Sequence, residues 1–226
     1  VTDYIRVLDR SGYFETVTLS EDDLKRNDMY RANAQRAKAQ SRFADYHDYL
    51  LSLEMTAEIG DFSPLYLQRI TQLTNKSNQF NLTTKRYTAE QMEAVYNSDE
   101  YIRLYGKLYD KFGDNGVVAV TIGKTDSENK GRLDIELWLM SCRVLKRDME
   151  LAMLDSLVEQ AKKRGIREIY GHYYPTAKNK MVAGLYESFG FEKISQDEEG
   201  NTAWRLLVEG YEDKNTVIKV KEEHYA

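Results

Sequence analysis

The residues best suited to chemistry lie where a strand pattern passes into a helix pattern. Residues 139–150 run from an apolar strand through a basic turn into a helix, and they include Cys142, the only cysteine. A helix that follows a strand presents free backbone N–H groups and its positive dipole end to the turn before it. Such a turn binds anions, phosphate groups included. The run predicts an anion site at Arg143, Lys146 and Arg147, or otherwise a solvated basic turn.

Two roles are open for Cys142. A thiolate can accept an acyl group, and the neighbouring Arg143, Arg147 and helix start would stabilise that thiolate. A lone cysteine near a strand end is more commonly a small buried apolar residue. Strand alternation puts Cys142 on the face of Trp138 and Met140 and does not show which face lines a cleft.

A second group of candidates lies in residues 75–86, which are dense in amides and hydroxyls. Lys76 and Arg86 could grip a carboxylate or a phosphate. Buried amides are costly unless paired, so this segment either lines a polar cleft or holds a loop together. The candidate substrate-binding residues here are Lys76, Asn78, Gln79, Asn81 and Arg86.

Histidine chemistry is limited to a single candidate. His47, His172 and His224 are scattered, and with one cysteine they give no metal-ligand spacing, so we expect no metal. His172 lies on a predicted strand between Tyr170 and Tyr173, where it could act as a base near neutral pH. The alternative is a histidine that is only hydrogen-bonded.

A mixed α/β sheet must position these residues. From residue 80 the pattern alternates between strands and helices, with three strands before a strand–helix–strand crossover. Predicted strands span 80–87, 101–112, 117–122, 133–141, 167–173, 191–195 and 202–208, and predicted helices begin at 88 and span 148–164 and 178–188. Polar turns are predicted at 113–116 and 126–131. This order predicts helices on both faces of the sheet.

The ends of the chain differ from this central part. Residues 1–62 are predicted to be helical, with Ser20 as a cap, and Pro64 begins a further helix after Ser63. Residues 209–226 form a charged tail in which 217–220 could be an edge strand. The predicted organisation is a helical leader over 1–62, a domain over 63–208 and a tail over 209–226.

Composition narrows the class of protein. The chain has 226 residues and a net charge of −5, which argues against general nucleic-acid binding. No apolar run reaches the roughly 18 residues that span a bilayer, so no membrane association is expected. One cysteine excludes an internal disulfide framework, which favours a cytoplasmic protein. The first residue is Val1, and we expect the chain to be part of a longer protein.

The region after residue 178 resembles the GCN5-related N-acetyltransferases (GNAT). The resemblance is carried by Asn179, Ala183, Leu185-Tyr186-Glu187 and Gly190-Phe191. It implies a GNAT-like, mostly antiparallel mixed sheet that binds coenzyme A or phosphopantetheine. Tyr186 would then protonate a leaving thiolate, or else pack between helix and sheet. Asn179 would hold the cofactor arm or cap a turn, with Thr176 as a helix cap beside it.

A narrower resemblance covers most of the chain. Residues 73–88, 141–145 and 175–179, with the leader over 11–33, resemble the FkbH-like proteins. These usually fuse a HAD-type phosphatase to a GNAT-like domain and load a glyceryl group onto an acyl carrier protein. No Asp-x-Asp pair ends an apolar strand here, so the resemblance implies that the phosphatase lies upstream, outside this chain.

The same comparison raises a question about the basic turn. In acetyltransferases this loop reads Arg/Gln-x-x-Gly-x-Gly/Ala, and here Lys146 and Asp148 replace both glycines. The resemblance favours acyl transfer, glyceryl by analogy, to a carrier pantetheine or with acyl-CoA. The lost glycines favour instead a catalytically silent module for partner docking or substrate positioning. Acetylation of a small amine is a third possibility.

Overall fold

The computed structural model describes residues 21–222, with side chains over 31–221. The chain divides into two compact units, Val1–Ala44 and Asp45–Ala226. In the first unit the described backbone forms α2 (Glu21–Gln40), which lies within the predicted helical leader. The predicted cap Ser20 and the start of the leader motif lie outside the described residues.

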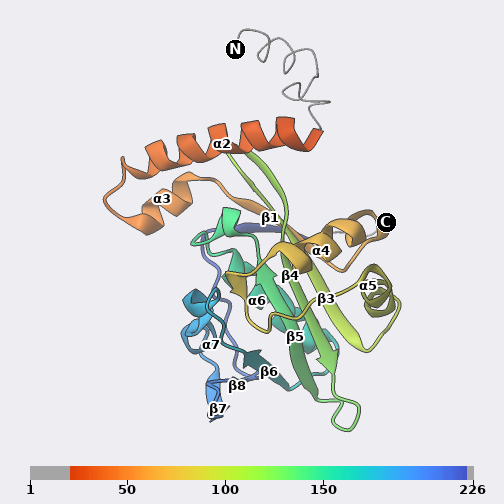
Figure 1. The fold of residues 1–226 in the computed structure, drawn as a ribbon. Helices are drawn as coiled ribbons and strands as arrows, with labels where there is room; N and C mark the ends of the chain where they lie inside the picture. Colours follow the sequence, from red (N-terminus) through yellow and green to blue (C-terminus); the bar gives the residue numbers. More distant parts are fainter. Residues whose placement is uncertain (1–20, 223–226) are drawn as a thin grey trace, which may run out of the picture. The chain divides into compact units, whose positions relative to one another are not determined.

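The second unit is built on one sheet, whose strands are spread along its whole length. They are β1 (Thr56–Gly60), β2 (Phe80–Asn81), β3 (Tyr101–Asp110), β4 (Gly113–Thr125), β5 (Arg132–Met140), β6 (Glu168–Tyr173), β7 (Glu192–Gln196), β8 (Thr202–Leu207) and β9 (Lys219–Glu222). The order is β7-β8-β6-β5-β4-β3-β1-β9, and β2 pairs with β5 beside this path (Figure 1). Only the β5–β6 and β1–β9 pairs are parallel. The predicted α/β fold with a mostly antiparallel sheet is confirmed.

The helices of this unit are short. They are α3 (Tyr46–Ser52), α4 (Pro64–Lys76), α5 (Ala89–Tyr96), α6 (Met149–Lys163) and α7 (Leu185–Ser188), with single turns η1 (Cys142–Val144) and η2 (Lys180–Val182). Pro64 begins α4 after Ser63, as predicted. The predicted capping box is also present, since Thr88 and Gln91 bond reciprocally at the start of α5.

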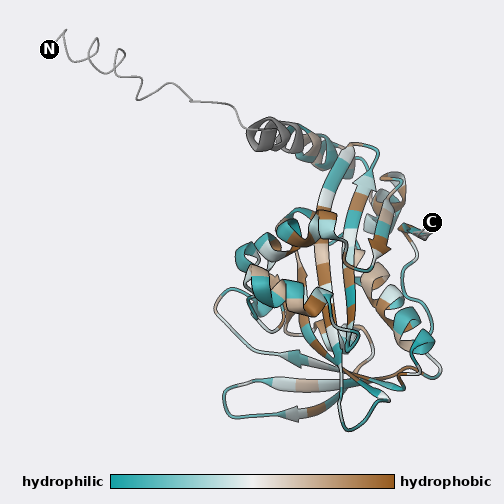
Figure 2. Ribbon diagram, turned by 90° about the vertical axis from the view of Figure 1, so that its right-hand side faces the viewer, coloured by the Kyte–Doolittle hydropathy of each residue, from teal (hydrophilic) through white to brown (hydrophobic). Residues whose placement is uncertain are grey.

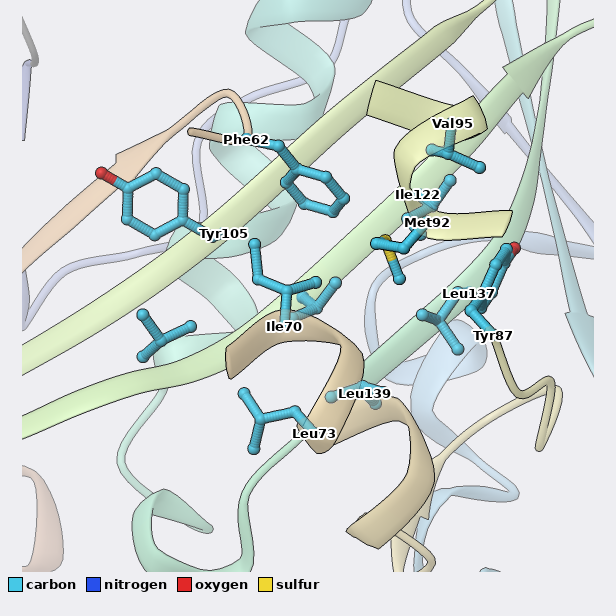
Figure 3. Close-up of a cluster of buried hydrophobic side chains, with 12 residues drawn as sticks. Phe62, Ile70, Leu73, Tyr87, Met92, Val95, Tyr105, Ile122, Leu137 and Leu139 are labelled. Atoms are coloured by element: carbon cyan, nitrogen blue, oxygen red, sulfur yellow. The ribbon is translucent and has the colours of Figure 1, made fainter. Parts of the chain in front are cut away.

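Helices cover both faces of the sheet. On one face, Ile70 and Leu73 of α4 pack on Leu137 and Leu139 of β5, together with residues of α5 (Figure 3). On the other face, Gly106 of β3 makes room for α6. A Cβ atom there would lie 2.3 Å from the Met149 Cε. Figure 2 shows the apolar residues concentrated along the middle strands, between the two helix layers.

Several predicted boundaries are wrong. The predicted leader helix is broken, and Thr56–Gly60 forms β1, where alternate burial of Ala57 and Ile59 fits a half-buried strand. The predicted strand 80–87 shrinks to two residues. The chain reverses before Gly113, which pairs with Asp110, so the predicted turn 113–116 lies inside β4.

The C-terminal part differs in two further respects. The predicted helix over 178–188 is split into η2 and α7. Residues 219–222 of the predicted tail form β9 beside β1, two residues later than the expected edge strand.

Candidate functional site

The two parallel strands at the centre of the sheet separate soon after they begin to pair. β5 pairs with β6 only from Arg132 to Asp134, while β4 covers the opposite edge of β5 along nearly its whole length. From Ile135 to Met140, one edge of β5 is therefore not paired with β6. We call the space between this part of β5 and the end of β6 the split. Places where neighbouring parallel strands diverge are common ligand sites in α/β sheets.

Glu136 lies at the point where the split begins. Ile122 pairs with Leu137 and Gly123 pairs with Ile135, so Glu136 is an extra residue that has no partner on β4. Such a β-bulge redirects side chains and is frequent next to active sites. The bulge gives this part of β5 a backbone different from that of a regular strand.

Two side chains hold the Glu136 carboxylate. Lys85 Nζ lies 2.5 Å from Glu136 Oε2, and the Tyr87 hydroxyl donates to the same oxygen at 3.1 Å. Burial, followed by the negative charge of Glu136, raises the pKa of Tyr87. A carboxylate is one of the side-chain groups that accept a proton in catalysis, and Lys85 and Tyr87 fix the orientation of this one. Sequence reasoning missed Glu136; its only signal was a lone acid in the apolar run after Asp134.

Residues 80–83, which we call the bridging segment, occupy the split. Phe80 and Asn81 pair antiparallel with Met140 and Leu139 of β5. Further along, the Leu82 N–H donates to the Trp138 carbonyl at 3.1 Å. The next residue continues this contact, because Thr83 Oγ1 donates to the Glu136 carbonyl at 2.7 Å.

The bridging segment also contacts the end of β6. The Tyr174 N–H donates to the Leu82 carbonyl at 2.9 Å. Phe80, Asn81 and Leu82 are at most 4% exposed. The segment therefore fills the split and hydrogen-bonds to both of its sides.

Asn179, a predicted cofactor-binding residue, braces this closure. Its Nδ2 donates to the carbonyls of Asn81 and Tyr174, both at 2.9 Å. Its Oδ1 accepts from the Thr176 N–H at 2.7 Å and from the Thr176 hydroxyl at 2.9 Å. The buried amide thus uses its full hydrogen-bonding capacity within the protein. Two roles were open for Asn179, which could hold the cofactor arm or cap a turn. These hydrogen bonds fit the second role.

The other predicted substrate-binding residues hold their own loop together. Arg86 donates to the Thr74 and Ser77 carbonyls and to Asn78 Oδ1. Asn81 Oδ1 accepts from the Thr84 N–H at 2.9 Å. Lys76 and Gln79 are exposed. Of the two possibilities for residues 75–86, these hydrogen bonds fit a segment that holds its own loop together, and not one that lines an open polar cleft.

Tyr186 lies across the split on the α7 side of the sheet. Its ring touches Gly171 of β6, where a Cβ atom would lie 2.3 Å from the Tyr186 Cζ, and it packs edge-on against Trp138 of β5. The side chain is fully buried, which raises the pKa of its hydroxyl. Tyr186 Oη lies by the His172 backbone. Neither Tyr186 Oη nor Trp138 Nε1 has a hydrogen-bond partner of normal geometry among the described residues.

His172 lies on β6 two residues beyond Tyr170, the last residue of β6 that pairs with β5. Its Nε2 is 3.3 Å from Asp134 Oδ1, and its ring stacks with Tyr174. Arg132 also binds Asp134, with contacts of 2.8 and 2.6 Å. Burial acts to raise the pKa of Asp134, but hydrogen bonds from His172 and Arg132 hold it below its ordinary value. His172 is thus hydrogen-bonded to the carboxylate of Asp134, the last residue of β5 that pairs with β6.

The predicted anion turn contains two residues other than glycine in the left-handed backbone conformation that glycine usually adopts. Lys146 and Asp148 have φ angles of 62° and 60°, in the left-handed region that favours glycine. These are the two positions at which the acetyltransferase loop carries glycines. Asp148 precedes α6 at the N-cap position, but its side chain makes no capping hydrogen bond.

The charges around this turn disfavour a diphosphate. Arg147 is buried, with Nη1 3.0 Å from Asp110 Oδ2 and Nη2 3.0 Å from the Arg143 carbonyl. Burial raises the pKa of Asp148 and takes that of Glu150 to about 7. Two carboxyl groups thus lie where an anion would meet the start of α6, and the principal buried cation is paired with Asp110. The diphosphate of coenzyme A does not fit this turn as it stands.

The remaining residues of the turn face outward or cover it. Cys142 and Arg143 are exposed, so the alternative of a small buried cysteine is wrong. The Tyr46 hydroxyl donates to the Lys146 carbonyl at 2.6 Å, which puts α3 against the loop. Across residues 21–222, no cluster of three metal-ligating side chains occurs, and no helix is long and apolar enough to cross a membrane.

Comparison with known proteins identifies the fold. No family profile matches the chain, and no curated protein matches it by sequence. Among solved structures, the ribosomal-protein-S18-alanine N-acetyltransferase from Escherichia coli is similar, with a TM-score of 0.51 and 14% identity over 71% of this chain and 99% of that chain. The protein yncA from Salmonella typhimurium, solved with its cofactor acetyl-CoA, gives 0.51 and 14% over 70% and 96%.

A third similar structure is the GNAT domain of S. lividans PAT, with a TM-score of 0.52 and 14% identity over 66% of this chain and 89% of that domain. At these identities the likeness shows a GNAT fold. Proteins described as acetyltransferases share this fold. The same fold here carries the split, the bulge at Glu136 and the turn before α6.

Proposed function

We propose that this chain transfers a small acyl group from or to a pantetheine thioester, with Glu136 at the reacting centre. The observation that carries the proposal is the position of Glu136. Its carboxylate, held by Lys85 and Tyr87, lies on a β-bulge where β6 leaves β5. A proton acceptor beside a strand edge is what acyl transfer to a thiol, hydroxyl or amine requires.

In this proposal different residues accept and donate the protons of the reaction. A bound thioester would supply an activated acyl carbon. Glu136 accepts the proton of the attacking group, and Lys85 and Tyr87 hold its carboxylate in place. Tyr186, kept protonated by burial, is the proton donor for the leaving sulfur. His172, hydrogen-bonded to Asp134 at the end of β6, is a second candidate base.

The turn before α6 favours one kind of thioester over another. Coenzyme A carries a diphosphate, whereas the arm of a carrier protein carries a single phosphate. Because Arg147 is paired and Asp148 and Glu150 are acidic groups, the turn suits the carrier arm better. The FkbH-like resemblance supports the same partner, an acyl carrier protein loaded with a glyceryl-like group by an upstream HAD-type phosphatase. Arg143 and Lys146 would then contact the single phosphate.

Calorimetry and turnover assays test the proposal. We expect an acylated carrier protein or S-acetyl pantetheine to bind and to lose its acyl group to an acceptor, and acetyl-CoA to bind more weakly. Tight binding of acetyl-CoA with acetylation of a small amine would instead support amine acetylation. If none of the three compounds binds, the acyltransferase proposal is wrong.

Cys142 is proposed as a transient acyl acceptor, because it is the only cysteine and is exposed beside the turn. After incubation with an acyl donor, intact-mass spectra should show one acyl adduct that is lost in Cys142→Ala. No adduct, or an adduct that survives the substitution, removes this role and leaves direct transfer at Glu136.

A second function is favoured by one observation, the bridging segment that fills the split. A domain whose binding edge is occupied by its own chain could serve as a non-catalytic module that docks a partner or positions a substrate. Such a module would bind its partner without any acyl transfer, and Glu136→Gln would leave that binding unchanged.

A further inference from the structure

We propose that the bridging segment, residues 80–83, is an autoinhibitory strand. It occupies the edge of β5 that an extended, amide-bearing thioester arm would use, and it must leave for the arm to bind. This inference rests on the proposed function, since it assumes that the arm binds in the split. It names how access to that site is regulated.

The first support is the edge itself. β4 covers one edge of β5, and β6 takes the other edge only as far as Asp134. The segment takes over that second edge further along, through backbone pairing with Leu139, Met140 and Trp138. An extended arm with amide groups binds a sheet edge through the same N–H and C=O groups. The segment and the arm therefore compete for one set of hydrogen bonds.

The second support is two buried donors that the closed state leaves unused. Trp138 Nε1 and Tyr186 Oη lie at the α7 side of the split and lack normal hydrogen-bond partners among the described residues. Both side chains are almost fully buried, at 0% and 1% exposure. Buried donors without partners are costly, and a ligand that carries carbonyl groups would supply partners. A polar arm bound in place of the bridging segment could therefore pair these two donors, which the closed state leaves unpaired.

The third support is that the closure is held by a few identifiable bonds. The strand itself has two residues, and two polar side chains fasten it. Thr83 bonds to the Glu136 carbonyl, and Asn179 bonds to the Asn81 and Tyr174 carbonyls. Thr83 therefore ties the segment to the residue we place at the reacting centre, so closure and access to Glu136 are coupled.

The experiment combines hydrogen exchange with binding. The variants are Thr83→Val, which keeps the side-chain shape and loses one bond, and Asn179→Ala, which loses both braces. The matched control is Asn215→Ala, which loses a similar two-bond brace to Ile218, far from the split in sequence. The probes are S-acetyl pantetheine and an acylated carrier protein, and amide exchange is followed over residues 80–85.

We expect ligand to accelerate exchange in residues 80–85 by about tenfold in the wild type. Thr83→Val should bind the probe about fivefold more tightly, because the open state becomes more populated. Asn215→Ala should match the wild type in both measurements. Should Asn179→Ala fail to fold, Thr83→Val alone carries the comparison.

Two results would overturn the proposal. The first rejects the autoinhibitory strand alone, and the second also rejects the proposed function. If the probe binds while exchange in residues 80–85 is unchanged or slower, the segment is not displaced, and the proposed function stands without it. If no probe binds to the wild type or to either variant, both the autoinhibitory strand and acyl transfer in the split are rejected.

Discussion

Arg147 Nη1 and Asp110 Oδ2 lie 3.0 Å apart, and the Asp110 carboxylate is fully buried. The pair ties the end of β3 to the turn before α6. Removing one member of a buried ion pair leaves an uncompensated charge, so we expect Asp110→Ala to lower the free energy of unfolding by about 3 kcal/mol. Urea denaturation measures this. Glu159→Ala, which breaks an exposed pair with Lys163, should change it by less than about 0.5 kcal/mol. Equal effects for the two variants would contradict the assigned role of the buried pair.

Lys146→Gly and Asp148→Gly should each stabilise the protein. Both residues have positive φ angles, which cost a residue with a Cβ atom about 1 kcal/mol relative to glycine. The control is Leu145→Gly, at a φ of −58°, which should destabilise. The double variant should also bind pyrophosphate more tightly than the wild type, because it loses the Asp148 carboxylate and exposes backbone amides. A double variant that is no more stable and binds no better would show that the turn has lost its anion-binding geometry.

Glu150 makes stability depend on pH. Burial raises the pKa of its carboxyl from an ordinary 4.5 to about 7, so the folded protein holds this proton more tightly than the unfolded chain. Its contribution is therefore fully present below about pH 4.5 and is lost as the pH rises through 7, with an amplitude on the order of 2 kcal/mol. Relative to wild type, Glu150→Gln should be no less stable at pH 5 and clearly more stable at pH 8, by urea denaturation. A constant difference across this range would contradict the assignment.

Glu136→Gln tests the reacting centre. We expect it to lower kcat for thiol release from S-acetyl pantetheine by about 100-fold, because the amide cannot accept a proton. Binding measured by calorimetry should stay close to that of the wild type. Glu192→Gln on β7, which changes an ion pair with Arg205 of β8, should leave kcat unchanged. Unchanged turnover in Glu136→Gln would move the base elsewhere, with His172 the next candidate.

Gly171→Ala tests the position of Tyr186. A methyl group at residue 171 would lie 2.3 Å from two Tyr186 ring carbons, so we expect a loss of about 2 kcal/mol in unfolding free energy. The loss should shrink in a Tyr186→Leu background, which a double-mutant cycle measures. Gly184→Ala is the matched control, because its added methyl group meets nothing within 4 Å. A Gly171→Ala cost that is independent of residue 186 would mean that the two residues are not packed as described.

The sequence predicted most of the strands and helices from β3 to β8 in their order along the chain, because that order follows from local periodicity. The alternating run 133–141 and the helical stripe after 148 gave β5 and α6 close to their bounds. β1 was missed because it follows a helix-rich leader and has five residues. The strand 80–87 was overextended because Thr83 is held by a side-chain hydrogen bond to Glu136 and Asn81 by a local bond from the Thr84 N–H, rather than by a long ladder.

The candidate site was less predictable than the fold. Through its resemblance to the GNAT proteins, the sequence marked Asn179 and Tyr186, and the structure brings both to the split, Asn179 as a brace and Tyr186 across its α7 side. It gave no sign that Glu136 sits on a bulge, because a bulge depends on the partner strand. It also gave no sign that Asp110 would pair with Arg147, since the two residues lie on separate elements. Pairings between distant residues account for both omissions.

The parallel contact between β1 and β9 has a consequence for biosynthesis. The Lys219 backbone N–H donates to the Met55 carbonyl, and Val220 pairs with Ala57. The first strand of this unit is therefore completed by a strand that is synthesised much later. Until residues 219–222 have left the ribosome, β1 keeps one bare edge, ready to pair with another chain. The charged segment that resembles a dispensable tail is thus the closing piece of the sheet. Expression fragments that stop near residue 209 should yield soluble protein poorly, because they leave that edge open.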